Sequence, residues 1–396
     1  MTYRKFKADY LFTGHHMMEA PSVLVTTGEG RIEAIVSPLE AGEDVEVFRG
    51  ILCPGFINCH CHLELSHMKG LIAEKTGMVD FLLAVMQQRT ADPDRIAQAI
   101  GEAEQDMLDH GIVAVGDICN TTDTLSRKRE GNMYYHNFIE AAGFVPQAAA
   151  QRFEASREVF SQFASLYDLP VESNSMVPHA PYSVSGNLFG MITQFPGNHL
   201  LTIHNQESEE ENEFMTGGTG SFLQLYRALG LDISFYRPSG KRSLAGLLPY
   251  FYSNQSLILV HNVSTREEDL RSVEESAPAG LEIYYCLCPG ANRYITGMLP
   301  DIGLLVSHGC KLVLGTDSLA SNHQLDLLSE IKILRQQYPQ LDTETLLGWA
   351  THNGARALQL DATLGSFRKG NQPGVLLLED TRGPQITEAT RVRRIL

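Results

Sequence analysis

The sequence lacks any run of about 18 consecutive apolar residues, the length that a helix needs to cross a bilayer. The N-terminal segment MTYRKFKADYLFTGHH also lacks the apolar core of a signal peptide. We therefore expect no membrane-spanning helix in this chain.

Cationic residues are scarce as well. Lys and Arg number 31 against 47 Asp and Glu, so the formal net charge is -16 and the pI is near 5.3. This charge opposes binding to a nucleic-acid backbone or to an anionic membrane surface. No run of Lys and Arg provides a local exception. The expected partner is a small molecule.

Cysteine is sparse, and the seven cysteines are an odd, scattered set. They predict no disulfide framework, which fits a reducing environment and makes the cytoplasm the expected location. The closely spaced Cys286 and Cys288 are interpreted as small buried apolar side chains rather than as metal ligands. Apolar residues make up 43% and charged residues 20% of the chain, which is typical of a globular protein.

Both ends of the chain predict short strands. Residues 1–54 contain apolar stretches separated by turns, with a hairpin turn expected at Gly28-Glu29-Gly30, and residues 361–396 show the same pattern. We expect the two ends to form one small β-sandwich domain.

Residues 55–360 alternate between short apolar runs and helix-like stretches such as 94–111 and 325–339. Continuous apolar runs bounded by turns are typical of strands in parallel sheets, which are buried on both faces. The runs cover residues 56–64, 111–119, 133–143, 173–181, 199–207, 256–264, 281–289 and 310–318. The fold class is α/β: eight such runs predict a (β/α)8 TIM barrel, with an open doubly wound sheet as the competing architecture.

Polar residues gather where these strands end, which is the face that carries the chemistry in a barrel. Five of the 14 histidines and one aspartate occupy such ends, namely His60, His62, His179, His204, His261 and Asp317. The spacing of His60 and His62 places both imidazoles on one face of a strand and turns Cys59 and Cys61 toward the helices. Three His and one Asp form a ligand set that zinc accepts while leaving a position for water.

Glu207 follows His204 by three residues and is the candidate proton carrier. A carboxylate above the metal could take a proton from water and pass it to a leaving amine. The alternative is another exposed glutamate of the acidic stretch ESEEENE. We expect Glu209, Glu210 and Glu213 of that stretch to form the solvated first turn of a helix.

The segments PGFINCHCHLE, HAPYSVS, HNQE, LVHN and LGTDSLASN occur in this order. Together they resemble the amidohydrolase superfamily. More narrowly, they resemble its metal-dependent deaminase and triazine hydrolase branch, which includes cytosine, guanine, S-adenosylhomocysteine and aminofutalosine deaminases. The resemblance covers nearly the whole chain, including the split terminal β domain.

The resemblance implies one divalent metal per chain, zinc ahead of iron, held by His60, His62, His204 and Asp317. Asp317 would also be the base toward water, His261 would orient that water, and Glu207 would carry the proton. Binuclear members carry a modified lysine on the fourth strand. The strand SNSMVPH has none, which implies a single metal.

Four residues are expected to bind substrate. His179 and Glu64 match substrate-side positions of the resembling proteins. Asn292 is retained in the segment CPGAN, although Ala291 stands there in place of a polar residue. Arg152, like Glu140, follows the third expected strand and could reach a ligand. Asp117, at the end of the second strand, is left open between a capping role and a site role.

The leading function is hydrolytic deamination, the release of ammonia from an amino-substituted heterocycle. A 6-aminopurine nucleoside derivative resembling S-adenosylhomocysteine or aminofutalosine is favoured, and a free nucleobase stays open. Glu207 supports this function because ammonia needs a proton to leave and chloride does not. The alternative is a ring-opening amidohydrolase of the imidazolonepropionase kind. A catalytically inactive scaffold is disfavoured because every ligand position is filled. A homodimer is expected from the resemblance alone.

Overall fold

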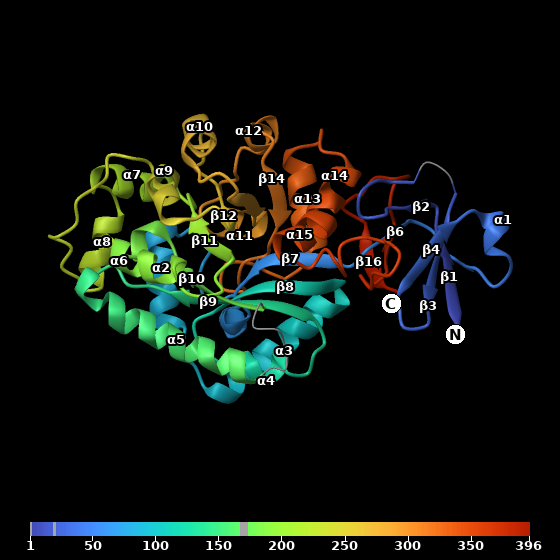
Figure 1. The fold of residues 1–396 in the computed structure, drawn as a ribbon, viewed down its shortest axis with the longest axis horizontal. Coiled ribbons are helices and arrows are strands. Elements are labelled where there is room, and N and C mark those ends of the chain that lie inside the picture. The colour runs from blue at the N-terminus through green and yellow to red at the C-terminus, as the bar shows by residue number, and fades with distance from the viewer. Residues whose placement is uncertain (1, 19–20, 167–172) are drawn as a thin grey trace.

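The computed structural model describes residues 2–18, 21–166 and 173–396. These residues form a mixed α/β fold in which parallel strands lie inside and helices lie outside, with a smaller group of strands at one end (Figure 1). None of the helices in the described ranges is both long and apolar enough to cross a membrane.

Eight strands of the central region form two four-stranded parallel sheets, in the orders β10-β9-β8-β7 and β11-β12-β13-β14. Each of the eight expected strands contains one of them. Their bounds are β7 (Phe56–Cys61), β8 (Ile112–Cys119), β9 (Tyr134–Ala141), β10 (Asn174–Pro178), β11 (Leu200–Asn205), β12 (Ser256–His261), β13 (Glu282–Leu287) and β14 (Lys311–Leu314).

Backbone hydrogen bonds connect the two sheets at both of their shared edges. After β10, the carbonyl oxygen of His179 accepts the amide of His204 on β11, at 3.0 Å. On the other side, the carbonyl oxygen of His60 on β7 lies 3.0 Å from the amide of Thr316 and 3.1 Å from that of Asp317, just beyond β14. These bonds place the carboxyl ends of all eight strands at one end of the molecule.

Helices cover the outer face of these strands. The longest helices, α3 and α5, run along the outside (Figure 1). The helices are α1 (Pro38–Ala41), α2 (Met78–Gln88), α3 (Pro93–Asp109), α4 (Leu125–Lys128), α5 (Ala149–Leu166), α6 (Gly186–Thr193), α7 (Glu209–Gly217), α8 (Phe222–Ala228), α9 (Ser243–Leu247), α10 (Glu267–Ser276), α11 (Pro289–Ile295), α12 (Ile302–Ser307), α13 (Leu327–Gln337), α14 (Thr343–Gly348) and α15 (Gly354–Ala357). The two helices expected at 94–111 and 325–339 are confirmed as α3 and α13.

The chain ends form two further four-stranded sheets, in the orders β4-β3-β1-β5 and β16-β15-β6-β2. The strands are β1 (Tyr3–Lys7), β2 (Tyr10–Leu11), β3 (Val23–Thr27), β4 (Ile32–Val36), β5 (Glu46–Val47), β6 (Ile51–Cys53), β15 (Leu376–Glu379) and β16 (Arg391–Arg394). The expected hairpin joins β3 to β4, and Gly30 adopts φ +89°, which glycine tolerates best. Phe6 and Leu377, one from each sheet, fall in one hydrophobic cluster, so the chain ends share a core.

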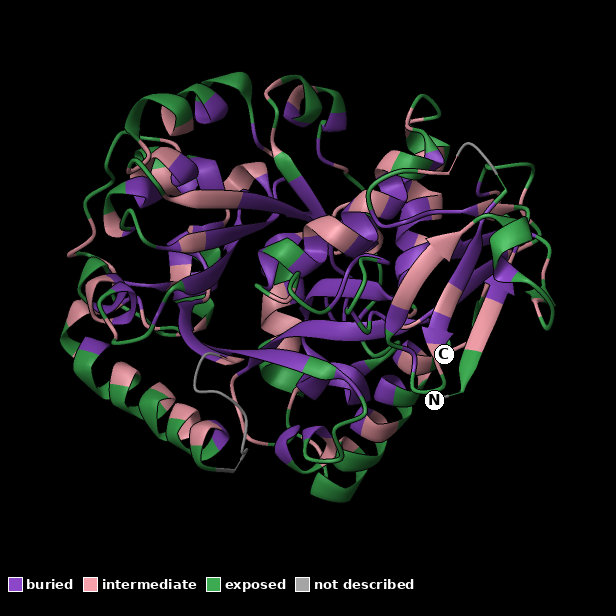
Figure 2. Ribbon diagram, turned by 45° about the vertical axis from the view of Figure 1, so that its right-hand side comes forward, coloured by how far each residue is buried: buried purple, intermediate pink, exposed green. Residues whose placement is uncertain are grey.

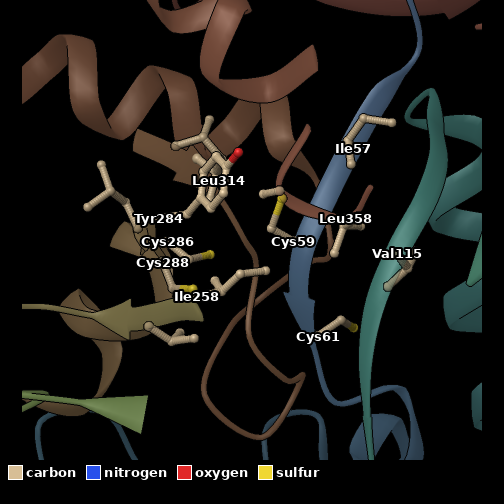
Figure 3. Packing of buried hydrophobic residues seen from close by; sticks show 14 of the residues in the cluster. Ile57, Cys59, Cys61, Val115, Ile258, Tyr284, Cys286, Cys288, Leu314 and Leu358 are labelled. Carbon is tan, nitrogen blue, oxygen red and sulfur yellow. The ribbon is translucent and has the colours of Figure 1, made fainter. Parts of the chain in front are cut away.

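Burial follows this layering: the central strands are buried along their length, whereas the helices expose their outer faces (Figure 2). Figure 3 shows part of the main core, where Cys59, Cys61, Cys286 and Cys288 lie among aliphatic side chains. All four are free and fully buried, as expected for Cys286 and Cys288. The thiol of Cys59 faces the carbonyl oxygen of Gly354 on α15, at 3.7 Å, which confirms that it points toward the helices.

Candidate active site

The strand ends bring together the polar residues singled out in the sequence. His60, His62 and His204 each offer a ring nitrogen, and these atoms lie within 4.8 Å of one another. Asp317, which directly follows Thr316 after β14, places Oδ1 3.6 Å from His60 Nε2 and 3.4 Å from His62 Nε2. All four residues are buried.

His204 has its tautomer fixed by the backbone. Its Nδ1 lies 2.8 Å from the carbonyl oxygen of His179, which can only accept, so Nδ1 carries the hydrogen. Burial lowers the pKa of His204 to about 4, so the ring is neutral near pH 7. Its Nε2 therefore presents a lone pair, and it lies 3.2 Å from Nε2 of His62.

His60 and Asp317 complete a donor set that suits a divalent metal. Both ring nitrogens of His60 are buried, and neither has a hydrogen-bond partner among the described residues. Unpartnered buried nitrogens are rare in folded proteins and point to a missing ligand. Three imidazole nitrogens and one carboxylate oxygen match a catalytic zinc site. The residues present fit such a metal.

Asp317 stays ionised in this environment. Burial alone would raise its pKa, but the neighbouring imidazoles of His60, His62 and His261 hold the pKa well below the usual range. The hydroxyl of Ser321 donates to Oδ2 at 2.5 Å, which leaves Oδ1 facing the histidines.

Glu207 and His261 form a second pair beside this cluster, with Glu207 Oε1 3.4 Å from His261 Nε2. Burial raises the pKa of Glu207 well above its usual value, and the negative charges of Asp317 and Glu211 raise it further. Burial also lowers the pKa of His261 well below its usual value. The amide nitrogen of Asn292 lies 2.9 Å from His261 Nδ1 and donates to it, which leaves the ring hydrogen on Nε2.

Backbone strain is concentrated at the same strand ends. Four non-glycine residues here have positive φ: Gln206 (48°), His261 (77°), Asn262 (59°) and Asp317 (58°). Residues other than glycine rarely adopt positive φ, and such backbone strain persists only where the surrounding structure holds it in place. The strain turns the chain sharply at the ends of β11, β12 and β14, so that the polar side chains converge.

A cavity of about 390 Å³ opens onto these residues, within the range of small-molecule sites. His62, His204, Glu207 and Asp317 lie on its lining. The helices α2 and α8 supply an apolar wall that includes Phe81, Val85 and Leu225.

Of the four residues expected to bind substrate, two line the cavity and two do not. His179 and Arg152 are on the lining, whereas Glu64 and Asn292 are absent from its described residues. Asn292 lies behind His261, as described above. The Glu64 carboxylate accepts hydrogen bonds from the amides of Asn120 and Thr121, both at 2.9 Å, and pairs with Arg89 at 3.0 Å. Glu64 thus contacts Arg89, and Asn292 contacts His261.

The sequence interpretation missed Arg89 and Asn120, which occupy the lining in place of Glu64. Asn120 directly follows β8, so its position at a strand end was an available signal. Arg89 caps the C-terminus of α2, and no local pattern distinguishes it from other arginines. Asp117 supports the backbone of the site: its Oδ1 accepts a hydrogen bond, at 2.8 Å, from the amide of Leu63, the residue that follows His62.

The chain is similar in sequence and in fold to several known proteins. The chain is 28% identical to an adenosine deaminase of Helicobacter pylori over 320 residues, covering 78% of this chain and 75% of that protein. It superimposes with a TM-score of 0.84 on Helicobacter pylori aminofutalosine deaminase in complex with methylthio-coformycin, at 22% identity, covering 99% of this chain and all of that one. An adenosine deaminase of Xanthomonas campestris with bound zinc gives a TM-score of 0.69 at 22% identity, covering 95% and 84% of the two chains. The model of the amidohydrolase family matches residues 51–392, which is most of the sequence, and the chain belongs to that family.

Proposed function

We propose that this protein is a metal-dependent hydrolytic deaminase that releases ammonia from a 6-aminopurine nucleoside derivative. The observation that carries the proposal is that the cluster His60, His62, His204 and Asp317 lies beside the pair Glu207 and His261. Both groups reach one cavity, which His62, His204, Glu207 and Asp317 line. Membership of the amidohydrolase family and likeness to purine nucleoside deaminases support it.

One divalent metal would be held by His60, His62, His204 and Asp317. When bound, such a metal supplies Lewis acidity that makes water a nucleophile near neutral pH. Zinc is proposed ahead of iron because three imidazoles and one carboxylate suit it, and a similar fold contains bound zinc.

The chain's own residues divide the proton transfers. Asp317 is ionised and would accept a proton from the attacking water. His261, neutral and with its hydrogen on Nε2, orients the oxygen that adds to the ring carbon. Glu207 has a raised pKa, which favours its protonated form, and it would act twice. It would donate one proton to the ring nitrogen, then take a second proton from the oxygen that has added and pass it to the leaving amine. The proton held by Asp317 would then restore the acid form of Glu207.

The cavity supports a nucleoside whose sugar carries an apolar group. Glu207, His179 and Arg152 all line it, and the amino-bearing ring is proposed to lie beside the first two. The apolar wall of α2 and α8 would accept a thioether or an aromatic substituent by the hydrophobic effect. Glu64 and Asn292 are proposed to act on substrate only indirectly, through Arg89 and His261.

We also propose a two-domain organisation for the chain. The eight central strands are proposed to close into one (β/α)8 barrel over residues 55–360, supported by the backbone bonds at both shared edges. Residues 1–54 and 361–396 are proposed as a separate β-sandwich, supported by their common cluster. The cytoplasmic location and the homodimer stay predictions.

An ammonia-release assay tests the function. The metal-loaded protein should release ammonia from at least one of adenosine, S-adenosylhomocysteine, methylthioadenosine and aminofutalosine, with guanine, 8-oxoguanine and cytosine as free-base comparisons. The Glu207→Gln variant, purified in parallel, controls for contaminating deaminases of the host. Ring-opened acid from an imidazolone or cyclic amide, without ammonia from any member of the panel, would replace the deaminase by the ring-opening alternative, which the purine deaminase relatives do not favour.

A further inference from the structure

The acidic stretch after β11 contains one carboxylate, that of Glu211, which the structure buries completely. Glu211 is 0% exposed, although it lies in the same first turn of α7 as the partly exposed Glu209 and Glu210. Burying a carboxylate is costly unless hydrogen bonds compensate it. Three donors surround it: the amide of Gln206 at 2.9 Å, the amide of Glu207 at 3.3 Å and the hydroxyl of Ser243.

The hydrogen bonds of the Glu211 carboxylate are unusual for the N-terminus of a helix. A glutamate at the third position of a helix ordinarily reaches back to the amide of the N-cap residue. Here the N-cap is Ser208, and Glu211 reaches past it to the two residues before. Ser243 begins α9, which packs beside α7 (Figure 1). The carboxylate therefore ties the end of β11 to two helices.

Gln206 shows what these bonds hold. Its φ of 48° lies in the left-handed region, which costs conformational energy for a residue with a side chain. Its carbonyl oxygen accepts the amide of Ser264 at 2.9 Å, and its side-chain oxygen accepts the hydroxyl of Thr265 at 2.7 Å. This turn redirects the chain so that Glu207 Oε1 lies 3.4 Å from His261 Nε2.

We propose that Glu211 is a positioning residue which, through the backbone of Gln206 and Glu207, holds the Glu207 carboxyl group beside His261 for proton delivery to the leaving group. The inference rests on the proposed function. It assigns to Glu211 no contact with substrate or metal. Without the Glu211 carboxylate, the turn at Gln206 relaxes and the Glu207 carboxyl group is no longer held beside His261.

Hydrogen exchange measured by mass spectrometry on the metal-free protein tests the positional part. In Glu211→Gln, the amides of Gln206 and Glu207 should exchange at least about tenfold faster, because a side-chain amide offers them only one acceptor oxygen. Glu210→Gln, one position earlier on the same helix, is the matched control and should leave this exchange unchanged. Unaltered exchange in Glu211→Gln would overturn the inference whatever the enzyme's activity.

A comparison of leaving groups tests the catalytic part. On a 6-amino substrate, Glu211→Gln should lower kcat by about 10- to 100-fold, the size expected when a proton-transfer group is misplaced. On the matching 6-chloro nucleoside, kcat should fall by a factor at least about threefold smaller, because chloride leaves without a proton and only the transfer to the ring nitrogen is impaired. Equal losses on both substrates, or no loss on the amino substrate, would contradict a positioning role.

Failure of the proposed function and failure of the Glu211 inference give different results. Wild-type protein that releases neither ammonia nor chloride would refute the proposed function, while the exchange measurement would still decide the role of Glu211. If Glu211→Gln does not fold, Ser243→Ala removes one donor to the same carboxylate. It should move both measurements in the same direction by a smaller amount, and the absence of either change would count against the inference.

Discussion

At the scale of single residues, the site depends on which atom of each side chain faces the cavity. The carbonyl oxygen of His179 fixes the hydrogen of His204 on Nδ1, so Nε2 is left as a metal donor. His204 belongs to two candidate ligand groups, one with His60 and His62 and one with Glu140 and His179, and with Nδ1 occupied it can serve only one of them through Nε2. One backbone hydrogen bond thus supports a single metal.

Glu207→Gln tests proton transfer at this scale. The variant should retain the metal, because Glu207 is not a ligand in the proposed site. Turnover of an amino substrate should fall by roughly 10²–10⁴-fold, since glutamine keeps the shape but cannot carry the proton. Steady-state kinetics together with metal analysis measure both parts. Near-normal turnover would remove Glu207 from the mechanism.

At the scale of elements, buried carboxylates hold the loops that follow the strands. Asp117 binds the amide of Leu63 after β7, and Glu330 on α13 binds the amide of Gly290 after β13, at 2.6 Å. Asp117 is itself paired with the buried amine of Lys128 on α4, at 2.5 Å. Burial alone would lower the pKa of Lys128, but Asp117 raises it above its usual value, so the amine stays charged. The loop that carries His62 is therefore anchored by an ion pair outside the cavity.

Lys128→Met should destabilise the protein by about 3–5 kcal/mol, because it leaves the Asp117 charge buried without its partner. Asp117→Asn should do likewise, and the double variant should lose less than the sum of the two because the residues are coupled. Urea unfolding measures all three. Arg157→Met breaks the exposed pair with Glu154 on α5 and serves as the control, with little change expected. Additive losses in the double variant would show that the pair does not act as a unit.

At the scale of the whole molecule, the proposed metal would link strand ends that are far apart in the chain. Purified protein should contain about one zinc or iron per chain, because the two candidate ligand groups among the described residues share His204, which can serve only one of them. His60→Ala should lose it. Removal of the metal should lower the melting temperature, since a ligand that binds only the folded state stabilises that state. Elemental analysis and calorimetry check this, and two tightly bound equivalents per chain would contradict the single site.

Acid stability should depend on His136, which is buried between β9 and β10 with Nε2 2.8 Å from the hydroxyl of Ser175. Burial lowers its pKa to about 3, whereas an unfolded chain titrates near 6.5. The unfolded state therefore binds the extra proton between these values. The stabilising contribution is present above about pH 6.5 and is lost as the pH falls toward 3.

His136→Gln should reduce the slope of unfolding free energy against pH by about 1.4 kcal/mol per unit over this window. Urea titrations at several pH values measure it. His323→Gln changes an exposed histidine and should leave the slope as in the wild type. An unchanged slope in His136→Gln would mean that the folded protein admits the proton.

The sequence by itself determined the elements and the cluster. Alternation of buried runs with helices is a local pattern, and polar residues at the ends of such runs must meet at one edge when strands are parallel. His60, His62, His204, His261 and Asp317 were therefore identifiable from the chain alone, and their convergence agrees with that expectation. The spacing of two residues between His60 and His62 also fixed their common face.

Only the tertiary structure decided what the carboxylates and amides do. The contacts of Glu64 with Arg89 and with the backbone amide of Asn120 could not be predicted from its position, and Glu211 was one glutamate among several in an acidic stretch. Asn292 supports His261 from 31 positions away. These roles depend on partners that are remote in sequence and on which backbone amides each carboxylate reaches in the folded chain. Residue type and spacing carry no information about such contacts, because burial and hydrogen-bond supply are set only when the elements pack.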